Sequence, residues 1–182
     1  MKLFALAASL REGSHNARLL ELAVAHAKGA GATVEIVPYS RLITPAYDEG
    51  ARAGGYPEGA EELKRLLEGS DGFLLASPEY NYSFPGSLKN TIDWVSRYRP
   101  VPFTGRHALL LSASTSLVGG NRGLWQLRVP LEALSTHVYP DMFSLAKAQE
   151  AFDGGVLRDE ALGRRLEGLV RGFVGLVGRV RG

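Results

Sequence analysis

Residues 72–94 read GFLLASPEYNYSFPGSLKNTIDW, and this stretch indicates most clearly how the chain folds. Its first five residues are continuously apolar, which is typical of a strand buried on both faces of a sheet. A polar segment follows from Ser77 to Pro85, and apolar residues return at helical spacing from Gly86. The order is strand, polar loop and helix, and open α/β sheets bind their ligands at such loops.

The loop after this strand is rich in planar and hydrogen-bonding side chains. It places Glu79, Tyr80, Asn81, Tyr82 and Ser83 in a row. Such groups suit the edge and face of a flat polar heterocycle. Tyrosine and asparagine are also ordinary residues of surface loops, so composition alone leaves both interpretations open.

A second apolar run, Lys2–Ala8, predicts another buried strand, and the polar loop SLREGSHN and a helical pattern follow it. The first N–H groups of a helix are unpaired and its dipole is positive there, which favours an anion. A phosphate group would find further donors in the loop. These are Ser9, Arg11, Ser14 and Asn16. The alternative is that Ser14 or Asn16 only caps the helix.

The absence of two known phosphate-binding motifs limits which phosphate-containing ligand the loop could bind. A dinucleotide fingerprint needs several glycines in this loop and an acidic residue at the end of the next strand. Here the loop holds only Gly13, and the strand predicted at Thr33–Val37 leads into Pro38. The chain contains no GxxxxGK[ST] run. A pocket for a terminal monophosphate is the better fit.

The rest of the chain continues the alternation of strands and helices. Further strands are predicted at Arg106–Ser112 and Thr136–Tyr139, and further helices at Pro57–Leu67, Gly86–Trp94, Asn121–Leu134 and Asp159–Val180. We therefore expect one α/β domain over residues 1–182, a doubly wound five-stranded parallel sheet with helices on both faces. In the strand order 2-1-3-4-5 the first and third strands are neighbours, so their two polar loops meet.

Composition excludes several classes of function. The chain has 182 residues and no cysteine, which excludes disulfides, thiolate metal sites and cysteine nucleophiles. Its net charge is +2, but the arginines are scattered among acidic residues, so we expect no nucleic-acid partner. No apolar run approaches the ~20 residues of a membrane span and the N-terminus enters a strand directly, so we expect a cytoplasmic protein without a membrane partner.

Two motifs resemble those of the NADPH-dependent FMN reductase family of flavodoxin-like proteins, whose relatives include chromate, quinone and azo-dye reductases. ASLREGSHN, residues 8–16, is similar to the phosphate loop GSLRxGSxN, and residues 78–94 are similar to the segment PEYNxSxPGxLKNAIDW. Ala8 and Thr91 stand where many members have glycine and alanine, and neither change removes a ligand-binding group. The resemblance extends in order over nearly the whole chain.

The resemblance implies a set of cofactor contacts. The FMN phosphate would be held by Ser9, Arg11, Ser14 and Asn16. The isoalloxazine ring would lie along Pro78, Glu79, Tyr80 and Asn81, with a further contact from Ser83. The loop 112–120, which is rich in small residues, would close the other side of the ring, with Ser114 as the hydroxyl contact. The alternative for this loop is a flexible surface turn.

The resemblance also implies the reaction. Hydride would pass from NADPH or NADH through FMN to a small acceptor, such as a quinone, an azo compound, chromate or free flavin, by a ping-pong mechanism. This scheme requires no metal and no acidic or basic catalytic side chain. Tyr80 and Tyr82 near Trp94 and Tyr98 form more aromatic surface than a small monomer usually exposes, so we expect a homodimer or homotetramer.

Two other classes of function stay open on the sequence. One is a flavodoxin-type electron carrier without reductase activity of its own. Such carriers are typically acidic, whereas this chain is slightly basic. The other is a binding or regulatory protein of the same fold without a redox cofactor, which a yellow colour on purification would exclude.

Overall fold

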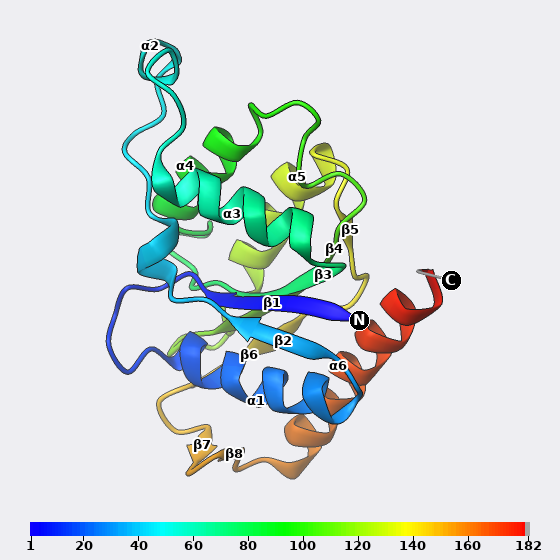
Figure 1. Cartoon of the computed structure of the whole chain (residues 1–182). Coiled ribbons are helices and arrows are strands. Elements are labelled where there is room, and N and C mark those ends of the chain that lie inside the picture. The colour runs from blue at the N-terminus through cyan, green and yellow to red at the C-terminus, as the bar shows by residue number, and fades with distance from the viewer. Residues whose placement is uncertain (181–182) are drawn as a thin grey trace.

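The centre of the structure is a parallel sheet with the strand order β2-β1-β3-β4-β5 (Figure 1). The computed structural model describes residues 1–180. The strands are β1 Lys2–Ala7, β2 Thr33–Ile36, β3 Gly72–Ala76, β4 His107–Ala113 and β5 His137–Val138. The predicted order is confirmed, and β1 and β3 are neighbours in parallel register. The loops that follow these two strands therefore leave the same edge of the sheet.

The last position of the sheet differs from the prediction of one strand at 136–139. Two short strands share it: β5 pairs with the start of β4, and β6, Phe143–Leu145, pairs with its end. Pro140 lies between them and has no N–H to donate to β4, so the ladder is interrupted there. When pairing resumes, Leu145 O accepts a hydrogen bond from Ser114 N at 3.0 Å, which fixes the chain just after β4.

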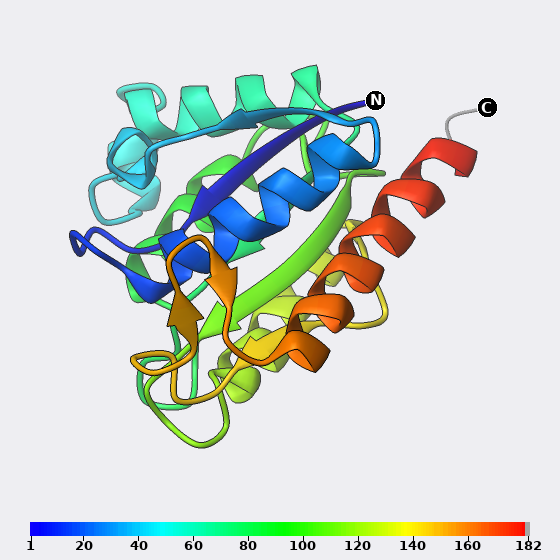
Figure 2. The same cartoon turned by 90° about the horizontal axis from the view of Figure 1, so that it is seen from below.

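Helices cover both faces of the sheet, as predicted (Figures 1 and 2). One face carries α1 His15–Gly29 and α6 Glu160–Val180. The other carries α3 Glu58–Gly69, α4 Gly86–Val95 and α5 Asn121–Ala133. Each face has its own buried apolar cluster, and every residue of β3 is buried. Burial on both sides is the physical reason for the continuous apolar run GFLLA.

Two smaller features lie outside the sheet and the helices that cover it. The connection after β2 contains the short helices η1, Tyr39–Leu42, and α2, Glu49–Arg52, and α2 projects from the body (Figure 1). Its base is anchored because Trp94 Nε1 donates to Pro45 O at 2.8 Å. A hairpin of β7, Phe152–Asp153, and β8, Val156–Leu157, lies beside the start of α1 (Figure 2). Strands of two residues are too short for any periodicity to predict.

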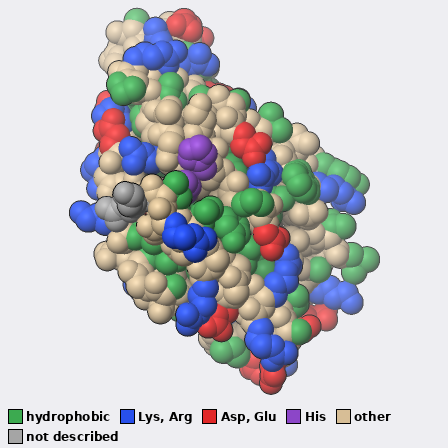
Figure 3. All heavy atoms as spheres, turned by 90° about the vertical axis from the view of Figure 1, so that its right-hand side faces the viewer, with side chains coloured by type: hydrophobic (Ala, Val, Ile, Leu, Met, Phe, Trp, Pro, Cys, Tyr) green, Lys and Arg blue, Asp and Glu red, His purple; other side chains and the backbone are tan. Residues whose placement is uncertain are grey.

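The surface shows no large area of one charge on the face drawn in Figure 3. Basic and acidic side chains are interspersed on this side, where the N-terminus and the end of α6 lie. Within residues 1–180, no helix is both long enough and apolar enough to cross a membrane.

Candidate functional site

A cavity of about 190 Å³ lies at the carboxyl ends of β1, β3 and β4, where the two polar loops meet. It is lined by Ser9, Arg11, Ser14, His15, Asn16, Pro78, Glu79, Tyr80, Ala113, Ser114 and Thr115. Eight of the ten predicted site residues are in this set. Asn81 and Ser83 lie in the turn just beyond Tyr80. His15, Ala113 and Thr115 line the cavity without having been predicted.

The loop just before α1, which borders this cavity, carries several backbone N–H groups without a partner among the described residues. Ser14 caps the helix, since its Oγ accepts from Asn16 N at 3.2 Å. Gly13 has φ +67°, a conformation that glycine adopts easily. Within the described residues, the N–H groups of Glu12, Gly13 and Ser14 donate no hydrogen bond. Together with the helix dipole they form a site suited to an anion.

Arg11 is the cation of this cavity, and its charge is not neutralised by the protein. Its side chain is exposed and forms no ion pair or hydrogen bond with any residue from 1 to 180. The backbone N–H of Arg11 donates to Ser9 Oγ at 3.3 Å, which shapes the loop around the cavity. An uncommitted guanidinium beside free N–H groups favours a phosphate.

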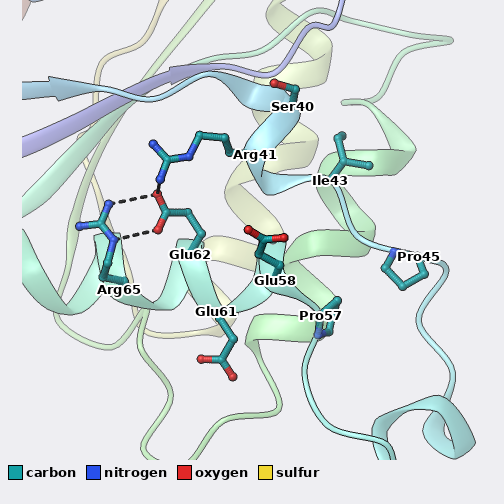
Figure 4. Close-up of a pocket in the computed structure, with 10 residues that line it drawn as sticks. Ser40, Arg41, Ile43, Pro45, Pro57, Glu58, Glu61, Glu62 and Arg65 are labelled. Atoms are coloured by element: carbon teal, nitrogen blue, oxygen red, sulfur yellow. Dashed lines mark hydrogen bonds and ion pairs between the residues drawn. The ribbon is translucent and has the colours of Figure 1, made fainter.

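A larger cavity, of about 650 Å³, lies between η1 and α3, but its cations are already paired (Figure 4). Glu62 lies between Arg41 and Arg65 and accepts from Arg65 Nε at 2.8 Å. The hydrogen bond from Arg65, followed by the charges of Arg65 and Arg41, lowers the pKa of Glu62 against the opposing effect of burial. With Glu58 and Glu61 also in its wall, this cavity is unsuited to an anion.

Asn16 joins the phosphate loop to the end of β4. Its Nδ2 donates to Ala113 O at 2.9 Å, and its Oδ1 accepts from Ala113 N at 2.9 Å. Both residues are buried, so these bonds are shielded from water. The structure thereby shows a positioning role for Asn16. Its direct contact with a phosphate, which the resemblance implied, stays a prediction.

The loop after β3 ends in a tight turn with an unusual backbone. Tyr80 and Ser83 exchange two backbone hydrogen bonds, of 2.8 and 3.0 Å, around Asn81 and Tyr82. Asn81 has φ +49° and Tyr82 has φ +68°, as in a type I′ turn. Asparagine tolerates this region, whereas a tyrosine is strained there. Strained residues of this kind concentrate at ligand-binding sites.

The first turn of α5 holds this loop in place. Gly123 N donates to Glu79 Oε2 at 2.9 Å, so the Glu79 carboxylate satisfies a helix N-terminus, and its contact with a ring stays a prediction. The guanidinium of Arg122 lies 4.3 Å from the centre of the Tyr82 ring. A Cβ atom on Gly123 would come within 3.1 Å of Ser83 O, which explains why glycine suits that position.

The third wall of the cavity is the start of the loop after β4. Ser114 N donates to Leu145 O, and Ser114 Oγ accepts from Ser116 N at 3.2 Å. Ser114 therefore faces the cavity from a fixed backbone, as predicted for a contact from this side. Its hydroxyl proton remains free to turn toward a ligand or toward Ser116 Oγ, 3.1 Å away.

Comparison with known proteins identifies the family of this chain. Residues 1–150 match the model of the NADPH-dependent FMN reductases. The chain is 37% identical over 165 residues to an NAD(P)H-dependent FMN reductase of Pseudomonas aeruginosa, covering 88% of this chain and 87% of that protein. It is 36% identical over 189 residues to an NAD(P)H:quinone oxidoreductase of Solanum tuberosum, covering 100% and 95%. Among solved structures, the flavoenzyme NAD(P)H:(acceptor) oxidoreductase FerB of Paracoccus denitrificans superimposes with a TM-score of 0.84 at 28% identity, over 98% and 97% of the two chains.

Proposed function

This chain belongs to the NADPH-dependent FMN reductase family, and we propose on that basis that it oxidises NAD(P)H and reduces a small acceptor through FMN bound in the cavity at the ends of β1, β3 and β4. The observation that supports this proposal is Arg11, whose guanidinium has no protein partner within residues 1–180 and which lines the cavity together with Ser9 and Ser14. These donors match a terminal phosphate, and the tyrosine-rich loop beside them matches a flat ring.

The cavity fits the phosphate end of FMN better than the whole molecule. Its volume of about 190 Å³ is below the roughly 300–1,000 Å³ typical of pockets for drug-sized ligands. Arg11, Ser9 and Ser14 would hold the phosphate inside it. The ring would lie at the mouth, between Tyr80 and Ser114, with one face open.

The residues around the mouth position rings and exclude water rather than exchange protons. FMN, when bound there, supplies an acceptor for the hydride of NAD(P)H and a donor of electrons to the second substrate. Pro78, Tyr80 and Ser114 would fix the ring from two sides, and Glu79 would act indirectly by anchoring the loop to α5. Because one face stays open, nicotinamide and acceptor would occupy the same space in turn, as in ping-pong kinetics. A quinone, an azo compound, chromate or free flavin would suit such a space.

Steady-state kinetics should show this alternation. Initial rates measured against NAD(P)H at several fixed quinone concentrations should give parallel double-reciprocal lines. The reason is that the oxidised nucleotide leaves before the quinone binds. Intersecting lines would mean that both substrates bind at once and would contradict a single shared face.

Anaerobic reduction distinguishes the enzyme from an electron carrier of the same fold. We expect stoichiometric NADPH or NADH to bleach the yellow protein within minutes, because nothing covers the open face against nicotinamide. A carrier would be bleached by dithionite but by neither nicotinamide. The same titration, run with each nucleotide in turn, measures the preference between them.

We also propose a homodimer or homotetramer in which a second copy packs beside the mouth of the cavity and leaves one face of the ring open. Large apolar side chains are exposed on three neighbouring segments: Tyr80, Tyr82, Leu117, Val118, Trp125 and Val129. Trp125 and Val129 are four residues apart on α5, and Arg122 on the same helix contacts the Tyr82 ring. Tyr80 belongs both to this apolar surface and to the lining of the cavity, so burial of the surface would form one wall beside the ring.

The dimer proposal predicts the effect of a charge on this surface. Replacing both Trp125 and Val129 with glutamate should give a monomer in sedimentation at micromolar concentration, because two buried charges oppose association. Val156→Glu is the matched control, since Val156 is 61% exposed on β8, outside the proposed surface. A wild-type monomer with full activity at micromolar concentration would refute the proposal.

A further inference from the structure

His15 is a residue of the cavity that the proposed function leaves without a role. It is the first residue of α1 and lines the cavity beside Arg11 and Ser14. Its imidazole lies parallel to the ring of Phe152, with 6.3 Å between ring centres and 9° between planes. Its Nδ1 atom is buried and has no hydrogen-bond partner in the described part of the chain. An unpartnered buried nitrogen is destabilising and requires a physical reason.

The charges that act most strongly on His15 are positive. Burial lowers the pKa of the His15 imidazole, and the charges of Arg11 and Arg18 lower it further. The Arg18 guanidinium lies 4.2 Å from the centre of the Phe152 ring, so the hairpin that carries Phe152 borders Arg18 as well as His15. The other facing segments present the uncharged side chains Ser114 and Thr115, together with Glu79, whose carboxylate is bound to Gly123 N. Three basic groups thus converge at the start of α1.

We propose that His15 is a further ligand of the FMN phosphate and takes up one proton from solvent when FMN binds. This inference rests on the proposed function, which puts the phosphate in this cavity. A phosphate dianion would reverse the local electrostatics, since an opposite charge within ~4–6 Å favours the charged form of a group by roughly 1–3 pKa units. The imidazole would then be neutral in the apoprotein and protonated in the complex, and the buried nitrogen would gain its partner.

Proton uptake by His15 would make FMN affinity depend on pH in a definite direction. Because the pKa of His15 would be higher in the complex than in the apoprotein, the contribution of His15 to FMN affinity is full below the pKa of the apoprotein. It is lost as the pH rises through the pKa of the complex. The phosphate itself ionises near pH 6 and changes affinity in the opposite direction, so the comparison must be made between variants at the same pH.

Calorimetry of FMN binding to the apoprotein at pH 7.0, in buffers with different ionisation enthalpies, counts the protons taken up. We expect about half a proton or more per FMN for the wild type and close to none for His15→Gln, which keeps a polar side chain that does not titrate. His15→Gln should bind FMN about 3- to 10-fold more weakly at pH 7.0. This deficit should shrink as the pH is raised above 8. Riboflavin, which lacks the phosphate, should bind to the wild type without uptake of protons.

A measurement on the wild type alone makes the test independent of how any variant folds. The chain has four histidines, and NMR can follow the imidazole signal of each one. The His15 signal should move to the position of a protonated imidazole when FMN is added at pH 7.0. A neutral His15 in the FMN complex, with equal proton uptake by wild type and His15→Gln, would overturn the proposal and leave His15 as packing for Phe152. Equal affinity of the wild type for FMN and riboflavin would instead overturn the phosphate site on which the proposal rests.

Discussion

Arg11→Ala should weaken FMN binding about 10- to 100-fold, while riboflavin binding changes little. Charge-assisted hydrogen bonds contribute roughly 1.5–3 kcal/mol each, which is about 10- to 160-fold in affinity, and the exposure of Arg11 to solvent lowers the upper limit. The change should be selective because the guanidinium has no partner among residues 1–180 and serves only the ligand. Quenching of flavin fluorescence measures both affinities on the same protein.

Two further variants identify the cause of this loss. Arg52→Ala removes the same charge from the projecting helix α2 and should leave FMN affinity unchanged. Arg11→Lys keeps the charge but loses the planar pair of donors, so its affinity should be intermediate. If Arg11→Ala binds FMN as tightly as the wild type, the phosphate does not lie in this loop.

Asn16→Ala should lower the free energy of unfolding of the apoprotein by about 2–4 kcal/mol. The substitution removes two buried hydrogen bonds and leaves the N–H and C=O of Ala113 without partners, at a cost of roughly 1–3 kcal/mol for each unsatisfied group. Urea denaturation measures the change. FMN affinity should fall by about a decade or more as well, because the start of α1 loses its attachment to β4.

The matched control is Asn121→Ala, at the start of α5, where the side chain makes no hydrogen bond within residues 1–180. It should change stability by less than about 0.5 kcal/mol. Asn16→Asp should be destabilised at pH 7 and should recover stability as the pH falls, because a protonated carboxyl can again donate to Ala113 O. A stability of Asn16→Ala equal to that of the wild type would show that the two bonds contribute nothing.

The order of the sheet and the place of the site could be predicted because both depend on local patterns. Strands β1 and β3 are buried on both faces, so they read as continuous apolar runs, and polar loops follow each one. The parallel order then brings these loops together without any further information. The interruption at Pro140 could be predicted only in part. The proline is visible in the sequence, but the return of the chain to the sheet as β6 depends on its pairing with β4, which the sequence does not show.

The roles of single side chains were harder to predict, because they depend on partners far away in the sequence. Asn16 was interpreted as a phosphate ligand, yet its amide is bound to Ala113, 97 residues later. Glu79 was placed along a ring, yet its carboxylate caps α5 at Gly123, 44 residues later. A polar side chain that can bind a ligand can bind a backbone amide equally well. Only the fold shows which of these partners lies within reach. His15 was missed because the histidine follows a helix cap and forms no recognisable pattern with Phe152.

The bond between Asn16 and Ala113 also determines when the protein can become functional during its synthesis. The phosphate loop is synthesised before its anchor at the end of β4, which follows 97 residues later. Ser114, in turn, is bound to Leu145. Contacts so distant in sequence form late in folding, after the entropy of closing a long loop has been overcome. FMN would therefore bind only to a chain whose central strands are already assembled. Cofactor capture would thus mark the completion of folding rather than guide its early steps.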